Sequence, residues 1–404
     1  MAYSWNSTET PQVRYAIIGN GFDLECGLNT SYRDFLSFVK DGEFERLDKS
    51  GFGPAFPVDW QGFRDRNFWY ERFNTIQIGS GWVDFENEIA RVVANVERSM
   101  LREDGSIAFM ADEVEWTTSN SSKQMLNEIV CSWQGTDISI ETYQELVKQL
   151  IYDLNELTRC FEAYLFNHVK TTVPKSTEAT ERLIKDLNAC DVARVISFNY
   201  TSTLEGMLKQ NGFDADFCYV HGVVTDGSGK NRMVLGIDER SDAEESERLA
   251  AFGPFRKYNQ RIYKQADSRY MTWLLDDCVP YNKARELSEM EDHFVLSSGS
   301  GVDLEKTLKR ISVMKGENEN EKRVKEVIIF GHSLGVTDKD ILKAFISLPD
   351  TRTVVYYHNE ESFSHQVSNM TAILGVDEVI ARTGGRERTL EFRNQNDSSS
   401  GCNP

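Results

Sequence analysis

A glycine turn near the start of the chain has residues suited to holding phosphate groups. It consists of Gly19, Asn20, Gly21, Phe22 and Asp23. The turn directly follows the apolar run 13–18, and glycines there would let the backbone approach a pyrophosphate closely. The usual fingerprint has a third glycine at the position occupied by Leu24, and two glycines alone also occur in structural turns. The turn therefore predicts binding of a dinucleotide, with NAD as the expected ligand, if other motifs support it.

Two further side chains that could act on a small molecule also follow apolar runs. Asn199 comes after the run 193–198, and its amide could orient a ribose or a water molecule. His221 comes after the run 217–220, where a neutral imidazole could act as a general base near pH 7. Each has a structural alternative, because asparagine often caps turns and a buried imidazole can simply hydrogen-bond a carbonyl.

A second glycine-rich segment has the pattern G-x-S-x-G. It consists of Gly331, His332, Ser333, Leu334 and Gly335. Between a strand and a helix, this pattern is typical of serine hydrolases, with Ser333 as the nucleophile. An acid and a histidine would have to follow it. The available candidates are Asp350 or Asp377 with His358 or His365. In a serine hydrolase the helix after the nucleophile usually has small, apolar residues that pack against the sheet. Residues 336–340 include charged ones instead, so we keep the hydrolase as the alternative interpretation.

Short apolar runs predict the strands that would position these segments. They lie at 13–18, 193–198, 217–220, 233–235, 327–330 and 353–357. Most are apolar throughout, as in a sheet covered on both faces, and a helix is expected to begin near Thr30 or Ser31. The pattern favours an α/β fold with a Rossmann-like parallel sheet. The carboxyl ends of its strands would carry the motifs.

The stretch between the first two strands has helical periodicity. Apolar residues recur every three or four positions within 85–100 and again within 146–165. We therefore expect a large helical insertion in a discontinuous core. The predicted parts are a core of 1–41 and 189–382, a mainly helical insertion of 42–188, and a partly disordered tail of 383–404.

Composition excludes several classes of protein. The 45 Lys and Arg against 64 Asp and Glu give a net charge of −19, which argues against nucleic acid as a partner. The sequence has no apolar run of the roughly 20 residues that cross a bilayer, and its first residues do not resemble a signal peptide. Its seven cysteines have no paired spacing, so neither a disulfide framework nor a zinc site is expected. We expect a cytoplasmic protein that needs no metal.

Together these segments resemble the AbiH family of bacteriophage abortive-infection proteins. The blocks that carry the resemblance are IIGNGFDLECGLNTSYRDF, WVDFE, SFNYTSTLE, VHG and IIFGHSLGVTD. They span most of the chain. The resemblance implies an antiviral effector that is held inactive until infection, and either a homo-oligomer or a regulatory partner protein would fit that role.

A more distant resemblance, to sirtuin-like NAD-consuming domains, implies chemistry. Those domains have a similar glycine turn, then an asparagine block, then His-Gly, then a G-T-S-L segment, in the same order as here. The resemblance implies that Asn199 lies near the nicotinamide ribose and that His221 is the base. It also implies that residues 19–23 cradle the pyrophosphate and that Gly331, His332 and Ser333 contact the adenosine half.

The chain departs from sirtuins in lacking their paired-cysteine zinc module, so peptide deacetylation is not expected. The remaining shared reaction is cleavage of the bond between nicotinamide and ribose, with NAD as substrate. Asp23 or Glu25 could stabilise the positive charge that develops on the ribose. The alternatives are the serine hydrolase and a nucleotide-sensing protein that binds NAD without turnover.

Overall fold

The computed structural model forms two compact units, which are described separately. The sheet unit comprises the described residues of Met1–Leu28, Pro174–Gly222 and Asp267–Pro404, and the helical unit those of Asn29–Val173 and Val223–Ala266. The structure describes residues 13–46, 58–80, 85–97, 100–101, 107–108, 137–138, 140–169, 171–224, 231–237, 252–278, 325–348, 351–384 and 388–396.

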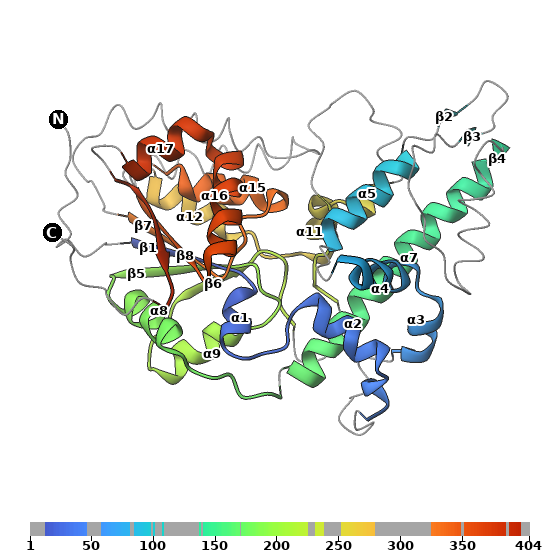
Figure 1. Ribbon diagram of the computed structural model, residues 1–404, viewed down its shortest axis with the longest axis horizontal. Coiled ribbons are helices and arrows are strands. Elements are labelled where there is room, and N and C mark those ends of the chain that lie inside the picture. The colour runs from blue at the N-terminus through green and yellow to red at the C-terminus, as the bar shows by residue number, and fades with distance from the viewer. Residues whose placement is uncertain are drawn as a thin grey trace. The chain divides into compact units, whose positions relative to one another are not determined.

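The sheet unit is built on six parallel strands (Figure 1). They are β1 (Val13–Ile18), β5 (Val192–Ser197), β6 (Asp216–Tyr219), β7 (Lys325–Phe330), β8 (Thr351–Tyr357) and β9 (Leu390–Asn394). Their order across the sheet is β6-β5-β1-β7-β8-β9. This is the strand order of a Rossmann fold. The first three strands are added outward from β1 on one side and the last three on the other, so the strand order reverses between β1 and β7. The predicted α/β fold with a parallel Rossmann-like sheet is confirmed.

The central strand β1 is buried along its whole length, as its apolar sequence predicts. Val13 is in register with Val192 of β5 on one side and Lys325 of β7 on the other. The Tyr15 ring packs at 4.9 Å from the Phe345 ring, and its hydroxyl donates to a backbone carbonyl. The carboxyl ends of β1, β5 and β7 therefore lie together at one edge of the sheet.

Helices cover both faces of this sheet. Figure 1 shows α8 and α9 on one side and α12, α15, α16 and α17 on the other. The helices of this unit are α1 (Gly21–Glu25), α8 (Glu178–Asn188), α9 (Thr203–Gln210), α12 (Arg269–Cys278), the 3₁₀ turn η4 (Val336–Asp338), α15 (Lys339–Ile346), α16 (Glu360–Leu374) and α17 (Val376–Gly384). Apolar side chains of α12, α15, α16 and α17 share one buried cluster with the strands.

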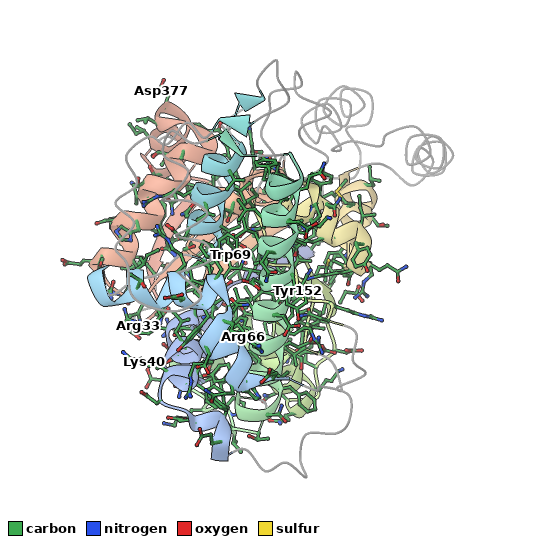
Figure 2. All side chains as sticks on the ribbon, turned by 90° about the vertical axis from the view of Figure 1, so that its right-hand side faces the viewer. Arg33, Lys40, Arg66, Trp69, Tyr152 and Asp377 are labelled. Carbon is green, nitrogen blue, oxygen red and sulfur yellow. The ribbon has the colours of Figure 1, made fainter. Side chains whose placement is uncertain are left out.

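The helical unit has a separate aromatic core. Its helices are α2 (Tyr32–Lys40), η1 (Glu43–Arg46), α3 (Trp60–Arg66), α4 (Phe68–Ser80), α5 (Phe85–Glu97), α7 (Ile140–Tyr164), the π-helical η2 (Leu165–Val169), η3 (Gly253–Phe255) and α11 (Lys257–Lys264). An antiparallel sheet joins β2 (Met100–Leu101), β3 (Ile107–Ala108) and β4 (Asp137–Ile138). The Phe85 ring stacks at 4.0 Å from Tyr32 and at 3.8 Å from Phe73. Trp69 is fully buried and donates to a carbonyl of α7, whereas Tyr152 of α7 is exposed (Figure 2).

The charges of Glu162 and Lys264 influence each other within the helical unit. Glu162 of α7 is fully buried, and neither carboxylate oxygen accepts a hydrogen bond. Burial raises its pKa to about 7, and the charge of Lys264 acts against that rise. Burial also lowers the pKa of Lys264 to about 8. The Lys264 ammonium donates to the Met233 carbonyl.

The helices expected from the sequence are confirmed by α2, α5 and α7, and Ser31 caps α2 through a capping box. One predicted strand is wrong. Residues 233–235 are buried but form no strand, because the Gln260 amide bonds both the N–H and the carbonyl of Leu235. The Gln260 side chain thus makes the backbone hydrogen bonds that a neighbouring strand would make.

The tail and the boundaries also differ from the expectation. Strand β9 lies within 383–404, where no strand was predicted, while residues 397–404 lie outside the described part of the chain. The predicted boundaries were 41/42 and 188/189, whereas the chain passes between the two units at 28/29 and 173/174. Residues 223–266 also belong to the helical unit.

Candidate active site

The residues singled out in the sequence meet at one edge of the sheet unit. The glycine turn follows β1, Asn199 follows β5, His221 follows β6, and the second glycine-rich segment follows β7. Parallel strands bring these carboxyl ends together beside the reversal point between β1 and β7, where open α/β sheets bind their ligands.

The two glycine turns contact each other through their backbones. The Gly19 N–H donates to the Phe330 carbonyl at 3.1 Å, and the Gly21 N–H donates to the Gly331 carbonyl at 2.8 Å. A Cβ on Gly331 would lie 2.3 Å from the backbone nitrogen of Phe22, and the φ of Gly331 is +67°. Only glycine fits there. These glycines are thus required by the packing of the two turns, with or without a phosphate.

Asp23 of α1 is a carboxyl group at this edge with 1% of its surface exposed. The Thr201 hydroxyl donates to its Oδ2, while Oδ1 makes no hydrogen bond of normal geometry. Burial raises the pKa of Asp23 to about 6, and the side chains of Thr201, Thr203 and Asn199 act against that rise. Near neutral pH the group is thus a carboxylate, retained in a site that disfavours its charge.

Asn199 is buried next to Asp23, with 4% of its surface exposed. Its backbone N–H donates to the Ser197 hydroxyl at 3.3 Å, but its side-chain oxygen Oδ1 has no hydrogen bond. Buried polar atoms without partners are rare in folded proteins. The Oδ1 atoms of Asn199 and Asp23 are therefore two acceptors suited to hydroxyl or amide donors of a ligand.

His221 is buried beside the carboxylate of Asp338. Its Nε2 lies 3.1 Å from Asp338 Oδ1, and both side chains are about nine-tenths buried. The Phe198 ring stands edge-on to the imidazole, with 5.3 Å between ring centroids, and Tyr200 lies 6.3 Å away. A carboxylate beside an imidazole stabilises its protonated form, so the arrangement suits a base.

His332 lies on the other side of the same carboxylate. Its Nε2 is 3.7 Å from Asp338 Oδ2, and its ring stands edge-on to Phe198 at 4.5 Å. The Leu334 N–H donates to its Nδ1 at 2.9 Å, and the Gln366 amide donates to its carbonyl. The His332 ring is thus part of the buried polar cluster.

Ser333 is exposed, and the described residues bring no imidazole to its hydroxyl. Of the predicted partners, His358 contacts Gln395 and Glu25, and His365 and Asp377 are exposed on α16 and α17. Asp350 lies outside the described residues. The strained residue of the turn is Leu334, with a φ of 61°, whereas in a nucleophile elbow it is the serine.

Sequence reasoning missed Asp338. It was counted among the charged residues that argue against an elbow helix, although it ends the block IIFGHSLGVTD. Glu86, from the block WVDFE, pairs instead with Lys257 at 2.8 Å within the helical unit. Trp82 and Asp84 of that block lie outside the described residues.

Within the described residues no group of three or more His, Cys, Asp and Glu side chains could hold a metal ion. None of the described helices combines the length and hydropathy needed to span a membrane.

One family model matches most of the chain. The model of the family described as bacteriophage abortive infection AbiH matches residues 15–358, from within β1 to the end of β8. A comparison with curated proteins finds no match. The matched range includes every residue of the site just described.

Proposed function

Because the chain belongs to the AbiH family of bacteriophage abortive-infection proteins, we propose that it acts in that defence by hydrolysing NAD at the nicotinamide–ribose bond. One observation carries the proposal. Asn199, His221 and the Gly19 turn, which lie far apart in the sequence, meet at the reversal point of a Rossmann sheet. Loss of NAD would halt metabolism in an infected cell before phage are released.

The described side chains fit a ribosyl substrate. The unpaired Oδ1 atoms of Asn199 and Asp23 can accept from ribose hydroxyls or from a water molecule. The glycines themselves add little, because the packing of the two turns already requires them. Contacts of residues 19–23 with the pyrophosphate, and of 331–333 with the adenosine half, rest on the resemblance to sirtuin-like domains.

The reaction needs a base and a stabilised sugar cation. A water oxygen bonds to the ribose carbon, the carbon–nitrogen bond breaks, and nicotinamide leaves as a neutral molecule with that bond's electron pair. His221 accepts the proton of the water, and Asn199 orients the water or the ribose. The Asp23 carboxylate stabilises positive charge on the ribose. The products are nicotinamide, ADP-ribose and one proton, which His221 releases to solvent.

Nicotinamide release from NAD by the purified full chain tests this proposal, with and without lysate of phage-infected cells as the source of a trigger. We expect release that His221→Ala reduces by a factor on the order of 10² or more. The matched control is His365→Ala, which removes an exposed histidine of α16 and should leave release unchanged.

Two results would overturn the proposal. Full release from His221→Ala would show that the imidazole is not the base. Thermal stabilisation by NAD with no product under either condition would identify a nucleotide sensor instead. No observation on the described residues favours the serine hydrolase.

A further inference from the structure

One carboxylate in the sheet unit faces two imidazoles. Asp338 Oδ1 lies 3.1 Å from Nε2 of His221, and Oδ2 lies 3.7 Å from Nε2 of His332. The three side chains are between 5% and 10% exposed. Asp338 is at the end of η4, directly before α15, while the histidines follow β6 and β7. The cluster thus forms because the segment after β6 meets the segment 332–338 after β7.

The turn after β7 fixes the state of one of these imidazoles. Leu334 has a φ of 61°, a conformation that a leucine rarely adopts, and its N–H points back to His332 Nδ1 at 2.9 Å. An imidazole nitrogen that accepts from an N–H carries no proton, so a neutral His332 has its proton on Nε2, which faces Asp338. Protonation at Nδ1 would set two N–H groups against each other.

The two imidazoles therefore differ in what they can do. The Leu334 N–H restricts His332 to its neutral form, and its Nε2 lies 3.7 Å from Asp338 Oδ2, beyond hydrogen-bond distance. The Asp338 carboxylate stabilises a proton on His221, whose Nε2 lies 3.1 Å from Oδ1, more strongly than one on His332, whose Nε2 lies 3.7 Å from Oδ2. The proton that the cluster accepts is therefore located on His221.

We propose that Asp338 is the positioning residue of His221, and that Leu334 holds His332 neutral so that the Asp338 charge stabilises the proton accepted by His221. This inference rests on the proposed hydrolysis, in which the attacking water supplies that proton. It also gives the G-x-S-x-G segment a purpose other than carrying a nucleophile: its strained turn aims a backbone N–H at an imidazole.

Kinetics of nicotinamide release test the positioning role. Asp338→Asn keeps the size of the side chain but removes its charge. We expect kcat to fall by a factor on the order of 10² to 10⁴, with the KM for NAD changed by less than about threefold. The matched control is Asp340→Asn, two residues along in the first turn of α15, where the side chain is exposed. An Asp338→Asn variant that folds and is fully active would overturn the inference.

A second measurement does not depend on turnover. Nitrogen-detected NMR of the full chain, labelled in its six histidine rings, reports the protonation of each nitrogen. His332→Gln and His221→Gln assign the two signals. At pH 7 we expect His332 to be neutral with its proton on Nε2. We also expect Asp338→Asn to shift the His221 nitrogens.

The two measurements separate the inference from the function on which it rests. A His332 ring protonated on Nδ1, or on both nitrogens at pH 7, would refute the arrangement whatever the activity. The expected NMR pattern together with a wild-type chain that never releases nicotinamide would support the arrangement and overturn NAD hydrolysis instead.

Discussion

Replacing the buried Asp23 carboxyl with an amide should make the sheet unit more stable at neutral pH. The pKa of this group rises on folding from 3.8 to about 6 because burial disfavours its charge. That difference corresponds to about 3 kcal/mol, at about 1.4 kcal/mol for each pKa unit. Since Asp23 is 1% exposed, solvent screening does not reduce this figure appreciably.

The sign follows from proton binding. The folded pKa lies above the unfolded value, so the folded state binds more protons between roughly pH 4 and pH 6. The wild-type sheet unit therefore loses stability as the pH rises through that interval. At pH 7 the whole free-energy cost of burying the Asp23 carboxylate lowers its stability. Asp23→Asn keeps an acceptor for the Thr201 hydroxyl.

Amide hydrogen exchange of β1 measures the free energy that opens the sheet unit without assuming that the two units unfold together. At pH 7 we expect β1 in Asp23→Asn to exchange about 150-fold more slowly than in the wild type, and the gain to disappear near pH 4. Asp377→Asn is the control, since Asp377 is exposed on α17 (Figure 2).

Slower exchange should accompany weaker catalysis, because the carboxylate that costs stability is the one to which the proposed mechanism assigns stabilisation of the ribose cation. Two results would refute this reasoning. One is faster exchange of β1 in Asp23→Asn at pH 7. The other is a gain that is the same at pH 4 and pH 7.

Three further outcomes are expected. Gly331→Ala should lower the stability of the sheet unit by more than about 3 kcal/mol in thermal or chemical unfolding, because its Cβ meets Phe22 at a left-handed φ. Gly212→Ala, also at a positive φ (+73°) but in open space, should cost only about 1 kcal/mol. A fluorophosphonate probe should leave the chain unlabelled, and Ser333→Ala should retain nicotinamide release. Labelling of the wild type that is lost in Ser333→Ala would instead support the serine-hydrolase interpretation. Burial raises the pKa of Glu162 to about 7, so the helical unit should lose stability from roughly pH 4.5 to pH 7, and Glu162→Gln should abolish that loss in exchange of α7 amides.

The sheet was largely predictable because its inner strands are continuous apolar runs. Strands buried on both faces leave that pattern, and β1, β5, β6, β7 and β8 were located to within two residues. The edge strand β9 was missed because it carries charged residues and is mostly half-exposed. A buried run such as 233–235 looks the same in sequence whether a strand or a glutamine side chain satisfies its backbone.

The candidate site was predictable only in part. Asn199 and His221 were found because residues that end parallel strands must lie at one edge of the sheet. The role of Asp338 was not visible, because its approach to two histidines depends on the η4 turn and on a left-handed Leu334. The sequence analysis assigned the glycines to ligand binding, whereas the structure shows that they are needed where the backbones of the two turns pack against each other.

The register of β1 determines when the site can form during synthesis. Residue 14 contacts residue 326, a separation of 312 positions, because β1 pairs with β7. Residue 331 of 404 must therefore have left the ribosome before the second glycine turn can meet the first. Contacts this distant form late in folding. A nascent chain shorter than 338 residues lacks Asp338, so the proposed site is incomplete until β7 and η4 have been synthesised.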